Sequence, residues 1–416
     1  MRKLFILLLF SVVFGNILLA LEFEQPGSYV PGELLVKLAQ KTSSATSPAS
    51  ITASITKDYN FAELNFEREL SARLNIWLVR YNNRSIDELS ILKQLTADPR
   101  INMAQLNHYI EERETPDDTM FPLQWNMHNT GQSGGVEDAD IDATEAWDIN
   151  VGGVCANGDT VIIAIVDSGC DLLHDDLNLW KNEAEIPGNG IDDDNNGYVD
   201  DYDGWNAVSH SGNVTTSSHG THVAGIAGAI GDNGLGVAGV NWNAKIMPIR
   251  GSTSLESVAV EAYSYVHEMR STWNETNGAE GAFVVTTNSS FGVNYGNPDN
   301  YPIWASMYDE MGEIGIISAT ATMNINADVD AVGDMPTSCD SEYMISVTNT
   351  TDADVKNGGA AYGLTTIDLG APGTTIRSTN YNNGYSNKTG TSMATPHVAG
   401  AIAYLISAAP LSFLNN

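Results

Sequence analysis

The feature that most constrains the fold of this chain is a series of runs in which almost every residue is apolar. These runs are rich in Val and Ile and span residues 160–167, 244–250, 281–290 and 314–321. A strand that is apolar on both faces is typical of a parallel sheet covered by helices on both sides. Stretches with helical character lie between or after the runs, at residues 219–230, 254–270, 300–311 and 392–408. The alternation predicts an α/β fold of three layers, in which helices flank an open, mostly parallel sheet.

Residues 21–114 differ in character from the rest and are predicted to form a small α+β module. Residues 31–39 and 74–81 read as strands, whereas residues 58–70 and 85–95 have helical composition. Residues 112–120 are polar, contain a proline and carry several charges, which indicates a linker and a site of cleavage. We therefore divide the chain into three segments, residues 1–20, 21–114 and 115–416.

The first twenty residues have the pattern of a secretory signal. They begin with MRK, continue through an apolar run from Leu4 to Phe14 and reach Ala20. An uncleaved membrane anchor is the alternative, since Leu4 to Leu21 approaches spanning length. Ser11, Gly15 and Asn16 interrupt the run and favour the signal. We expect the mature protein to be secreted, or at least to work outside the cytoplasm, without a membrane segment after signal removal.

The charge of the chain argues against a nucleic-acid partner. Nineteen Lys and Arg stand against 52 Asp and Glu, for a formal net charge of −33. Contact with phosphate groups requires Lys and Arg, so such an acidic protein is not expected to bind nucleic acid. The same excess of carboxylates is consistent with a protein that interacts with cations.

The three cysteines are too few for a scaffold held together by disulfides. Cys155 and Cys170 flank the predicted strand 160–167, which holds them apart unless the flanking loops fold back. We expect Cys155, Cys170 and Cys339 to be buried thiols, with a single disulfide as the alternative. No catalytic role is assigned to any of them.

Three stretches supply the side chains of nucleophilic catalysis. Asp167 ends the apolar run 160–167, His219 opens the stretch HGTHVAGIAGA, and Ser392 lies in GTSMATPHVAG. Each residue alone has a plain structural interpretation, because aspartates cap turns and buried histidines form structural hydrogen bonds. Serine is a weak nucleophile without a base and an orienting carboxylate. The three occur in the order Asp, His, Ser, which is the order of the subtilisin arrangement.

With HGTHVAG, GTSMATPHVAG and the shorter DSG at residues 167–169, the chain resembles the subtilisin-like (subtilase) serine peptidases over roughly residues 121–408. The resemblance implies an endopeptidase that acts on protein or peptide substrates through an acyl-enzyme. Residues 21–114 resemble the propeptide of the family, which assists folding and inhibits the enzyme intramolecularly. The implied product is therefore a self-inhibited precursor.

The same resemblance implies further site residues. The asparagine that stabilises the oxyanion corresponds to Asn324, with Asn326 in reserve, although the family's glycine before it is replaced by Met323. Ser290, Phe291 and Gly292 match the segment whose backbone pairs with an extended substrate; an ordinary strand end is the alternative. Asp334 falls in the region of the primary specificity pocket. An aspartate at its base predicts a preference for Lys or Arg before the scissile bond.

An acidic stretch between the aspartate and histidine motifs, residues 185–206, predicts a structural calcium site. Asp192, Asp194, Asn196 and Gly197 fall at positions 1, 3, 5 and 6 of a calcium-loop pattern. The carbonyl of Tyr198 is available at position 7, and Asp201 or Asp200 can close a shorter loop. Hard oxygen ligands select calcium over zinc or copper. A solvated acidic loop is the alternative.

The short segment after Ser392 and a non-catalytic alternative both bear on the enzymatic hypothesis. Only twenty-four residues follow Ser392, whereas the family's catalytic domain continues further, so we expect a truncated domain that is a fragment or a folded form of low activity. The alternative function is a secreted calcium-binding or interaction protein that keeps the peptidase fold but is catalytically impaired or inactive. Labelling of Ser392 by a fluorophosphonate distinguishes the two.

Overall fold

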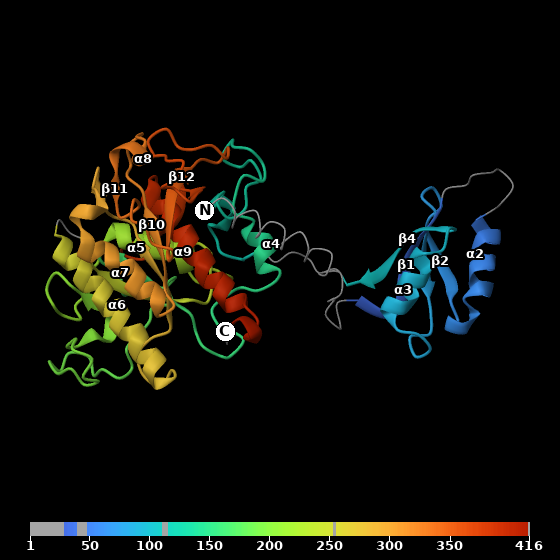
Figure 1. Cartoon of the computed structure of the whole chain (residues 1–416), viewed down its shortest axis with the longest axis horizontal. Helices are drawn as coiled ribbons and strands as arrows, with labels where there is room; N and C mark the ends of the chain where they lie inside the picture. Colours follow the sequence, from blue (N-terminus) through green and yellow to red (C-terminus); the bar gives the residue numbers. More distant parts are fainter. Residues whose placement is uncertain (1–28, 40–47, 110–114, 253–254, 415–416) are drawn as a thin grey trace. The chain divides into compact units, whose positions relative to one another are not determined.

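The computed structural model describes residues 29–39, 48–109, 115–252 and 255–414 and divides the chain into two compact units (Figure 1). The first unit comprises residues 1–112 and the second residues 113–416. The expected signal, residues 1–20, lies outside the described residues. Within the described ranges, no helix combines the length and the apolar composition needed to cross a membrane.

The first unit is an antiparallel sheet with two helices, which confirms its α+β character. Its core is formed by Leu34 and Val36 of the sheet together with Ile55, Ile91 and Leu95 of the helices. The strands have the order β2-β3-β1-β4. The elements are β1 (Tyr29–Leu38), α2 (Pro48–Asp58), β2 (Asn65–Ser71), β3 (Ile76–Arg80), α3 (Glu88–Thr96) and β4 (Ile101–His108).

The helix predicted over residues 58–70 is wrong. The helix ends at Asp58, and residues 65–71 form the edge strand β2, antiparallel to β3. The sequence NFERELS has helical composition because most of its side chains are exposed and polar. Backbone pairing and the edge-to-face contact between Phe66 and Trp77, with ring centroids 5.8 Å apart, outweigh that weak preference. The prediction also missed the fourth strand, β4.

The second unit is built on the parallel sheet that the apolar runs predicted. Seven strands lie in the order β13-β12-β10-β8-β5-β7-β6, and every neighbouring pair is parallel. The strands are β5 (Ile162–Asp167), β6 (Trp205–Asn206), β7 (Lys245–Arg250), β8 (Val284–Ser289), β10 (Ile317–Ala321), β12 (Met344–Thr350) and β13 (Leu369–Pro372). The four predicted runs are β5, β7, β8 and β10.

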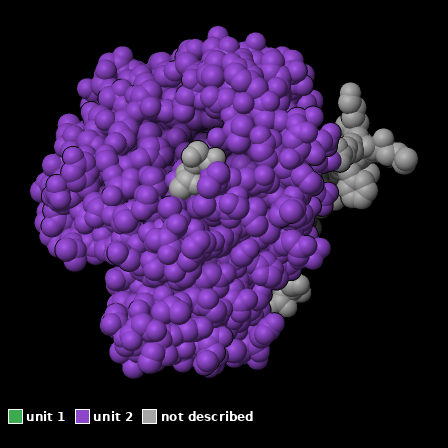
Figure 2. All heavy atoms as spheres, turned by 90° about the vertical axis from the view of Figure 1, so that its left-hand side faces the viewer, with its two compact units in different colours: residues 1–112 green, residues 113–416 purple. Residues whose placement is uncertain are grey.

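Helices cover both faces of this sheet, which confirms the three-layer architecture (Figure 1). Along β5, Ile163 and Ile165 pack into one core with residues of α5 and α9, whereas Ala164 and Val166 pack into a second core with α6 and α7. Figure 2 shows the second unit from one side as a continuous body of packed atoms. The helices are α5 (Ser218–Gly228), α6 (Glu256–Thr276), α7 (Pro302–Glu313) and α9 (Thr391–Ala408).

Short elements complete the second unit. Two small antiparallel pairs, β9 with β11 and β14 with β15, lie outside the main sheet. The remaining elements are α4 (Ala143–Trp147), β9 (Val293–Asn294), α8 (Val329–Val332), β11 (Asp334–Met335), β14 (Ile376–Asn380), β15 (Gly384–Lys388) and α10 (Leu411–Leu414).

Candidate active site

The parallel order of the sheet gathers candidate site residues at one edge. Strands β10, β8 and β5 are neighbours and run in the same direction, so their carboxyl ends meet. Asp167 is the last residue of β5, Ser290 follows β8, and Asn324 lies three residues after β10. The carboxyl ends of parallel strands are the usual place for a ligand site in an open α/β sheet.

Asp167 and His219 form a close pair. The Nδ1 atom of His219 lies 2.9 Å from both carboxylate oxygens of Asp167. Asp167 is buried and also accepts hydrogen bonds from the backbone N–H and hydroxyl of Ser168. Burial lowers the pKa of His219, but the hydrogen bond and charge of Asp167 outweigh burial and the opposing charge of Lys388, so that the net pKa is raised. The pairing sets Nδ1 as the protonated nitrogen and leaves Nε2 for proton transfer.

The start of α5 holds the imidazole in this position. Ser217 caps the helix, since its hydroxyl accepts a hydrogen bond from the backbone N–H of His219 at 3.3 Å. The next residue, Gly220, lies against the loop after β5. A Cβ atom there would stand 2.0 Å from the carbonyl oxygen of Gly169 and 3.1 Å from Oδ1 of Asp167. The glycine of HGTH is therefore required for the close approach of α5 to Asp167.

Ser392 lies in the first turn of α9. Its hydroxyl donates a hydrogen bond to the carbonyl oxygen of Ser290 at 3.2 Å, and the hydroxyl of Ser290 donates to the carbonyl oxygen of Ser392 at 3.0 Å. These reciprocal bonds join the start of α9 to the end of β8. Within the described residues, the structure includes no hydrogen bond between Ser392 and His219. Such bonds are often formed only in a complex with substrate.

Asn324 is fixed beside Ser392. Its Oδ1 atom accepts hydrogen bonds from the backbone N–H of Thr391 at 2.9 Å and from the hydroxyl of Thr391 at 3.2 Å. Because the oxygen is engaged, the amide nitrogen Nδ2 is the group left to donate, and within the described residues it has no protein partner. Asn326, the reserve candidate, instead accepts a hydrogen bond from Nζ of Lys356 at 3.1 Å. The geometry thus favours Asn324.

The segment after β8 has backbone groups outside the strand ladders, as pairing with an extended peptide requires. Phe291 and Gly292 lie between the ladder of β8 and that of β9, and belong to neither. The Phe291 ring stacks on Trp304 with ring centroids 5.9 Å apart. A Cβ atom at Gly292 would stand 2.2 Å from the carbonyl oxygen of Met335, so only glycine fits there. A pocket lined in part by Leu255, Phe291, Gly292, Tyr301 and Trp304 lies alongside.

Asp334 is a buried carboxylate held by neutral donors. Its Oδ2 atom accepts hydrogen bonds from the hydroxyls of Thr322 and Thr337, at 2.9 and 2.8 Å, and from the backbone N–H of Met323 at 2.7 Å. Burial raises the pKa of Asp334, although these hydrogen bonds oppose the shift. No Lys or Arg among the described residues forms an ion pair with it. Asp334 is thus bonded to the backbone of Met323, the residue that directly precedes Asn324.

The acidic stretch contains a cluster of carboxylates that could hold a metal ion. Oxygen atoms of Glu185, Asp194 and Asp201 all lie within 4.8 Å of one another. Glu185 and Asp201 are buried, and burial raises the pKa of Asp201 to about 6. The amide of Asn182 donates to Asp194 at 2.9 Å and to Asp201 at 2.8 Å. None of the three carboxylates forms an ion pair with a Lys or Arg of the described ranges, an arrangement that favours a bound cation, and an all-oxygen set suits calcium.

The other predicted metal residues have different surroundings. Asp192 accepts hydrogen bonds from the backbone N–H groups of Asn196 and Gly197, which shapes the loop. The amide of Asn196 donates to both Asp194 and Asp201 at 3.1 Å. The ring of Tyr198 packs edge-on against Trp205 and Tyr265. Glu185 was missed, because it precedes the spacing pattern that drew attention to the loop.

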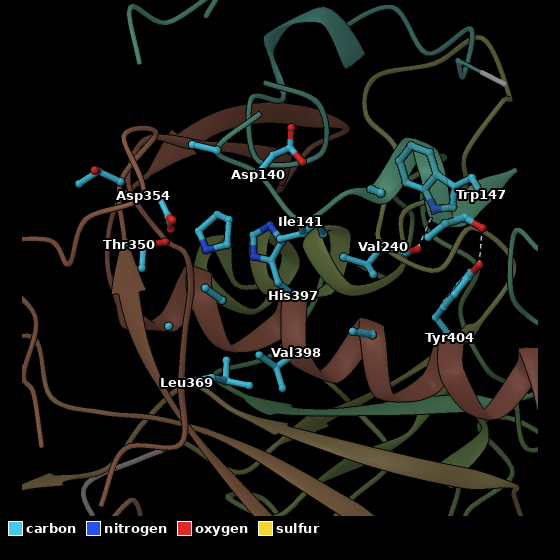
Figure 3. A pocket seen from close by; sticks show the side chains of 18 residues that line it. Asp140, Ile141, Trp147, Val240, Thr350, Asp354, Leu369, His397, Val398 and Tyr404 are labelled. Atoms are coloured by element: carbon cyan, nitrogen blue, oxygen red, sulfur yellow. Dashed lines mark hydrogen bonds between the residues drawn. The ribbon is translucent and has the colours of Figure 1, made fainter. Parts of the chain in front are cut away.

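The histidine of GTSMATPHVAG, His397, is structural. It is buried, its Nδ1 pairs with the carbonyl oxygen of Met393 at 2.9 Å, and its Nε2 lies 2.8 Å from Nδ2 of Asn126. Burial lowers the pKa of His397 to about 4. His397 lines a largely apolar pocket of about 280 Å³ between α4, β12, β13 and α9 (Figure 3). Asp167, His219 and Ser392 are not among the residues that line this pocket.

The three cysteines are free thiols. Cys155 and Cys170 are buried as expected, whereas Cys339 is half-buried and contacts the sulfur of Met335 at 3.4 Å. Burial raises the pKa of all three thiols, to about 11 for Cys155 and about 12 for Cys170 and Cys339. The structure contains no disulfide between them, so the alternative of one pairing is not supported.

Comparison with known proteins agrees with this geometry. The model of the subtilase family matches residues 158–415. An extracellular protease of Xanthomonas campestris pv. campestris is 28% identical over 91% of this chain and 66% of its own length. Subtilisin-like protease 1 of Plasmodium falciparum (isolate 3D7) is 34% identical over 59% of this chain and 37% of its own. The chain belongs to the subtilase family.

The coverage of these relatives is partial. This chain spans just under two thirds of the Xanthomonas protease and little more than a third of the Plasmodium protein. Among solved structures, a cold-adapted subtilisin-like serine proteinase is similar, with 25% identity over 59% of this chain and 75% of that chain and a TM-score of 0.43.

Proposed function

We propose that this chain is a secreted serine endopeptidase that hydrolyses peptide bonds through Asp167, His219 and Ser392. The observation that carries the proposal is the pairing of His219 with both oxygens of buried Asp167, at the same sheet edge as Ser392 and Asn324. Family membership and relatives named as extracellular proteases support it, and the signal-like residues 1–20 support secretion.

In the acylation step, Ser392 Oγ attacks the carbonyl carbon of the peptide bond. Nε2 of His219 takes the hydroxyl proton and then gives it to the leaving amine as the C–N bond breaks. Asp167 keeps Nδ1 protonated and stabilises the imidazolium. Water then hydrolyses the acyl-enzyme by the same transfers in reverse order, and frees Ser392.

The oxyanion formed in each step is stabilised by two donors. One is Nδ2 of Asn324, which is oriented because Oδ1 is held by Thr391. The other is the backbone N–H of Ser392 in the first turn of α9. Donors that are fixed before the reaction stabilise developing charge without a cost of reorganisation.

Substrate binding is assigned to two places. The backbone of Ser290, Phe291 and Gly292 would pair with the residues before the scissile bond as an added strand. Asp334 would attract a Lys or Arg side chain directly before that bond. A bound cation would favour the ionised form of this carboxylate, whose pKa burial otherwise raises.

The first unit is assigned the role of an inhibitory propeptide, residues 21–114. Its own hydrophobic core supports independent folding, and the polar stretch 112–120 between the units suits cleavage. Self-cleavage requires Ser392, so the full chain should accumulate unprocessed in Ser392→Ala. Equal processing of the variant and the parent would reject self-cleavage.

Calcium is assigned a structural role in residues 185–206. Glu185, Asp194 and Asp201 would hold the ion, with Asp192, Asn196 and Tyr198 shaping or completing the loop. When bound, the ion would neutralise buried carboxylates that otherwise repel one another. It has no part in proton transfer.

Hydrolysis of a peptide library by the purified chain tests the proposal. The expected result is cleavage at defined bonds that is abolished in Ser392→Ala. An intact chain that binds calcium but cleaves no peptide after removal of residues 21–114 would favour the non-catalytic alternative.

A further inference from the structure

An unpaired ammonium group lies beside the candidate catalytic histidine. Nζ of Lys388, the last residue of β15, donates a hydrogen bond to the hydroxyl of Ser218 at 2.7 Å. Ser218 is the first residue of α5 and directly precedes His219. Within the described residues, no carboxylate forms an ion pair with Lys388. This basic side chain has no ion pair although the chain has 52 Asp and Glu against 19 Lys and Arg.

The chemistry of the reaction indicates which part of a substrate passes this lysine. The acyl part of the substrate becomes bonded to Ser392, which is joined to Ser290 and so to the segment assigned to residues before the scissile bond. The leaving amine must receive its proton from His219. The residue that follows the scissile bond therefore lies on the His219 side, where Ser218 holds the ammonium of Lys388.

We propose that Lys388 is a specificity-determining residue that favours Asp or Glu immediately after the scissile bond. The inference rests on the proposed function, since it assigns the leaving-group side of the same site. Lys388 is half-buried, and its backbone belongs to the β14–β15 pair, in which it lies opposite Ile376. An ammonium group that is fixed in place and has no ion pair attracts an anionic substrate side chain and repels a cationic one. Lys388 would thus select substrates by charge through both attraction and repulsion.

A purely structural role for Lys388 is the competing explanation. In that case the bond to Ser218 serves only to anchor the start of α5. Ser218→Ala separates the two roles, because it removes the acceptor of the bond but leaves the ammonium in place. Lys388→Met removes the charge and keeps a stem of similar length, whereas Lys388→Arg keeps the charge.

The test uses peptides that the wild-type chain cleaves at a single bond and that differ only in the residue after it, Asp or its neutral isostere Asn. The measured quantity is the ratio of kcat/KM for Asp over Asn, which cancels changes in stability or in His219 common to both peptides. We expect a ratio of about fivefold in the wild type, the upper end for an ion pair near the surface. The ratio should fall to about one in Lys388→Met and be kept in Lys388→Arg and Ser218→Ala.

The outcomes separate this inference from the function on which it rests. Serine-dependent cleavage with equal Asp and Asn rates in the wild type, or an unchanged ratio in Lys388→Met, overturns the role of Lys388 and leaves the peptidase intact. A ratio lost equally in Ser218→Ala and Lys388→Met shows that anchoring, not charge, is responsible. Cleavage that survives Ser392→Ala, or no cleavage at all, overturns both.

Discussion

Oδ1 of Asn324 accepts a hydrogen bond from the backbone N–H of Thr391 at 2.9 Å, one residue before Ser392. This bond orients the asparagine so that its nitrogen, and not its oxygen, is available to a developing oxyanion. The oxygen thus holds the start of α9, and the nitrogen is the atom that we propose serves the reaction.

We predict that Asn324→Ala lowers kcat by about 10²- to 10³-fold with little change in KM, because the lost donor acts mainly in the transition state. Asn324→Asp is the matched control, since it keeps an oxygen for Thr391 but has no N–H to donate. We expect a loss at least as large. Near-normal turnover in Asn324→Asp would mean that the residue only supports α9.

The pH profile of kcat/KM tests the pair formed by Asp167 and His219. His219 must be neutral to accept a proton, and its net pKa is raised above the ordinary value of 6.5. Activity should therefore rise with pH through a midpoint above 6.5, and fall as acid protonates the ring. Asp167→Asn removes the contributions that raise the pKa and should lower kcat by about 10⁴-fold. A midpoint below 6.5 in the parent chain would contradict the assignment.

Calcium removal tests the acidic cluster. We expect a chelator to lower the melting temperature, because an ion at one hundred times its Kd stabilises the folded state by about 2.7 kcal/mol. Glu185→Gln keeps the shape of a buried ligand but removes its charge, and should weaken calcium binding and shrink the shift. Glu183→Gln, at an exposed glutamate outside the cluster, is the control. Equal shifts in both variants would exclude Glu185 as a ligand.

The proposed specificity before the scissile bond is assigned to Asp334. We predict faster cleavage after Lys or Arg than after Leu, and a fall of about tenfold or more in that ratio for Asp334→Asn, which keeps an acceptor for Thr322 and Thr337. Paired peptides that differ only at this residue give the ratio directly. Preferred cleavage after Leu or Phe that is unchanged in Asp334→Ala would rule out this role.

The sheet could be predicted because a strand that is buried on both faces appears in the sequence as an apolar run. Strands β5, β7 and β10 are apolar at most positions, and β8 begins with two valines and is buried along its whole length. Their expected bounds differ from the observed ones by a few residues. Strand β13 could not be found in this way because it is short and partly exposed. Strand β2 was mistaken for a helix because an exposed edge strand places polar residues on most positions.

The candidate site was predicted where a contiguous motif marks the residue, and missed where the contact is made only by folding. Asp167, His219 and Ser392 lie in recognisable stretches. By contrast, Lys388 meets Ser218 across 170 positions of sequence, and Glu185 reaches Asp201 from outside the loop pattern. No pattern in the neighbouring sequence predicts either contact.

The central claim is that Ser392 is a nucleophile activated by His219. Its most direct test is labelling of the chain, freed of residues 21–114, by a fluorophosphonate, with the modified residue located by mass spectrometry. We predict a single adduct on Ser392 that is lost in Ser392→Ala and forms much more slowly in His219→Ala. An unmodified Ser392 in the folded, calcium-loaded protein, or labelling at equal rates without His219, would contradict the account.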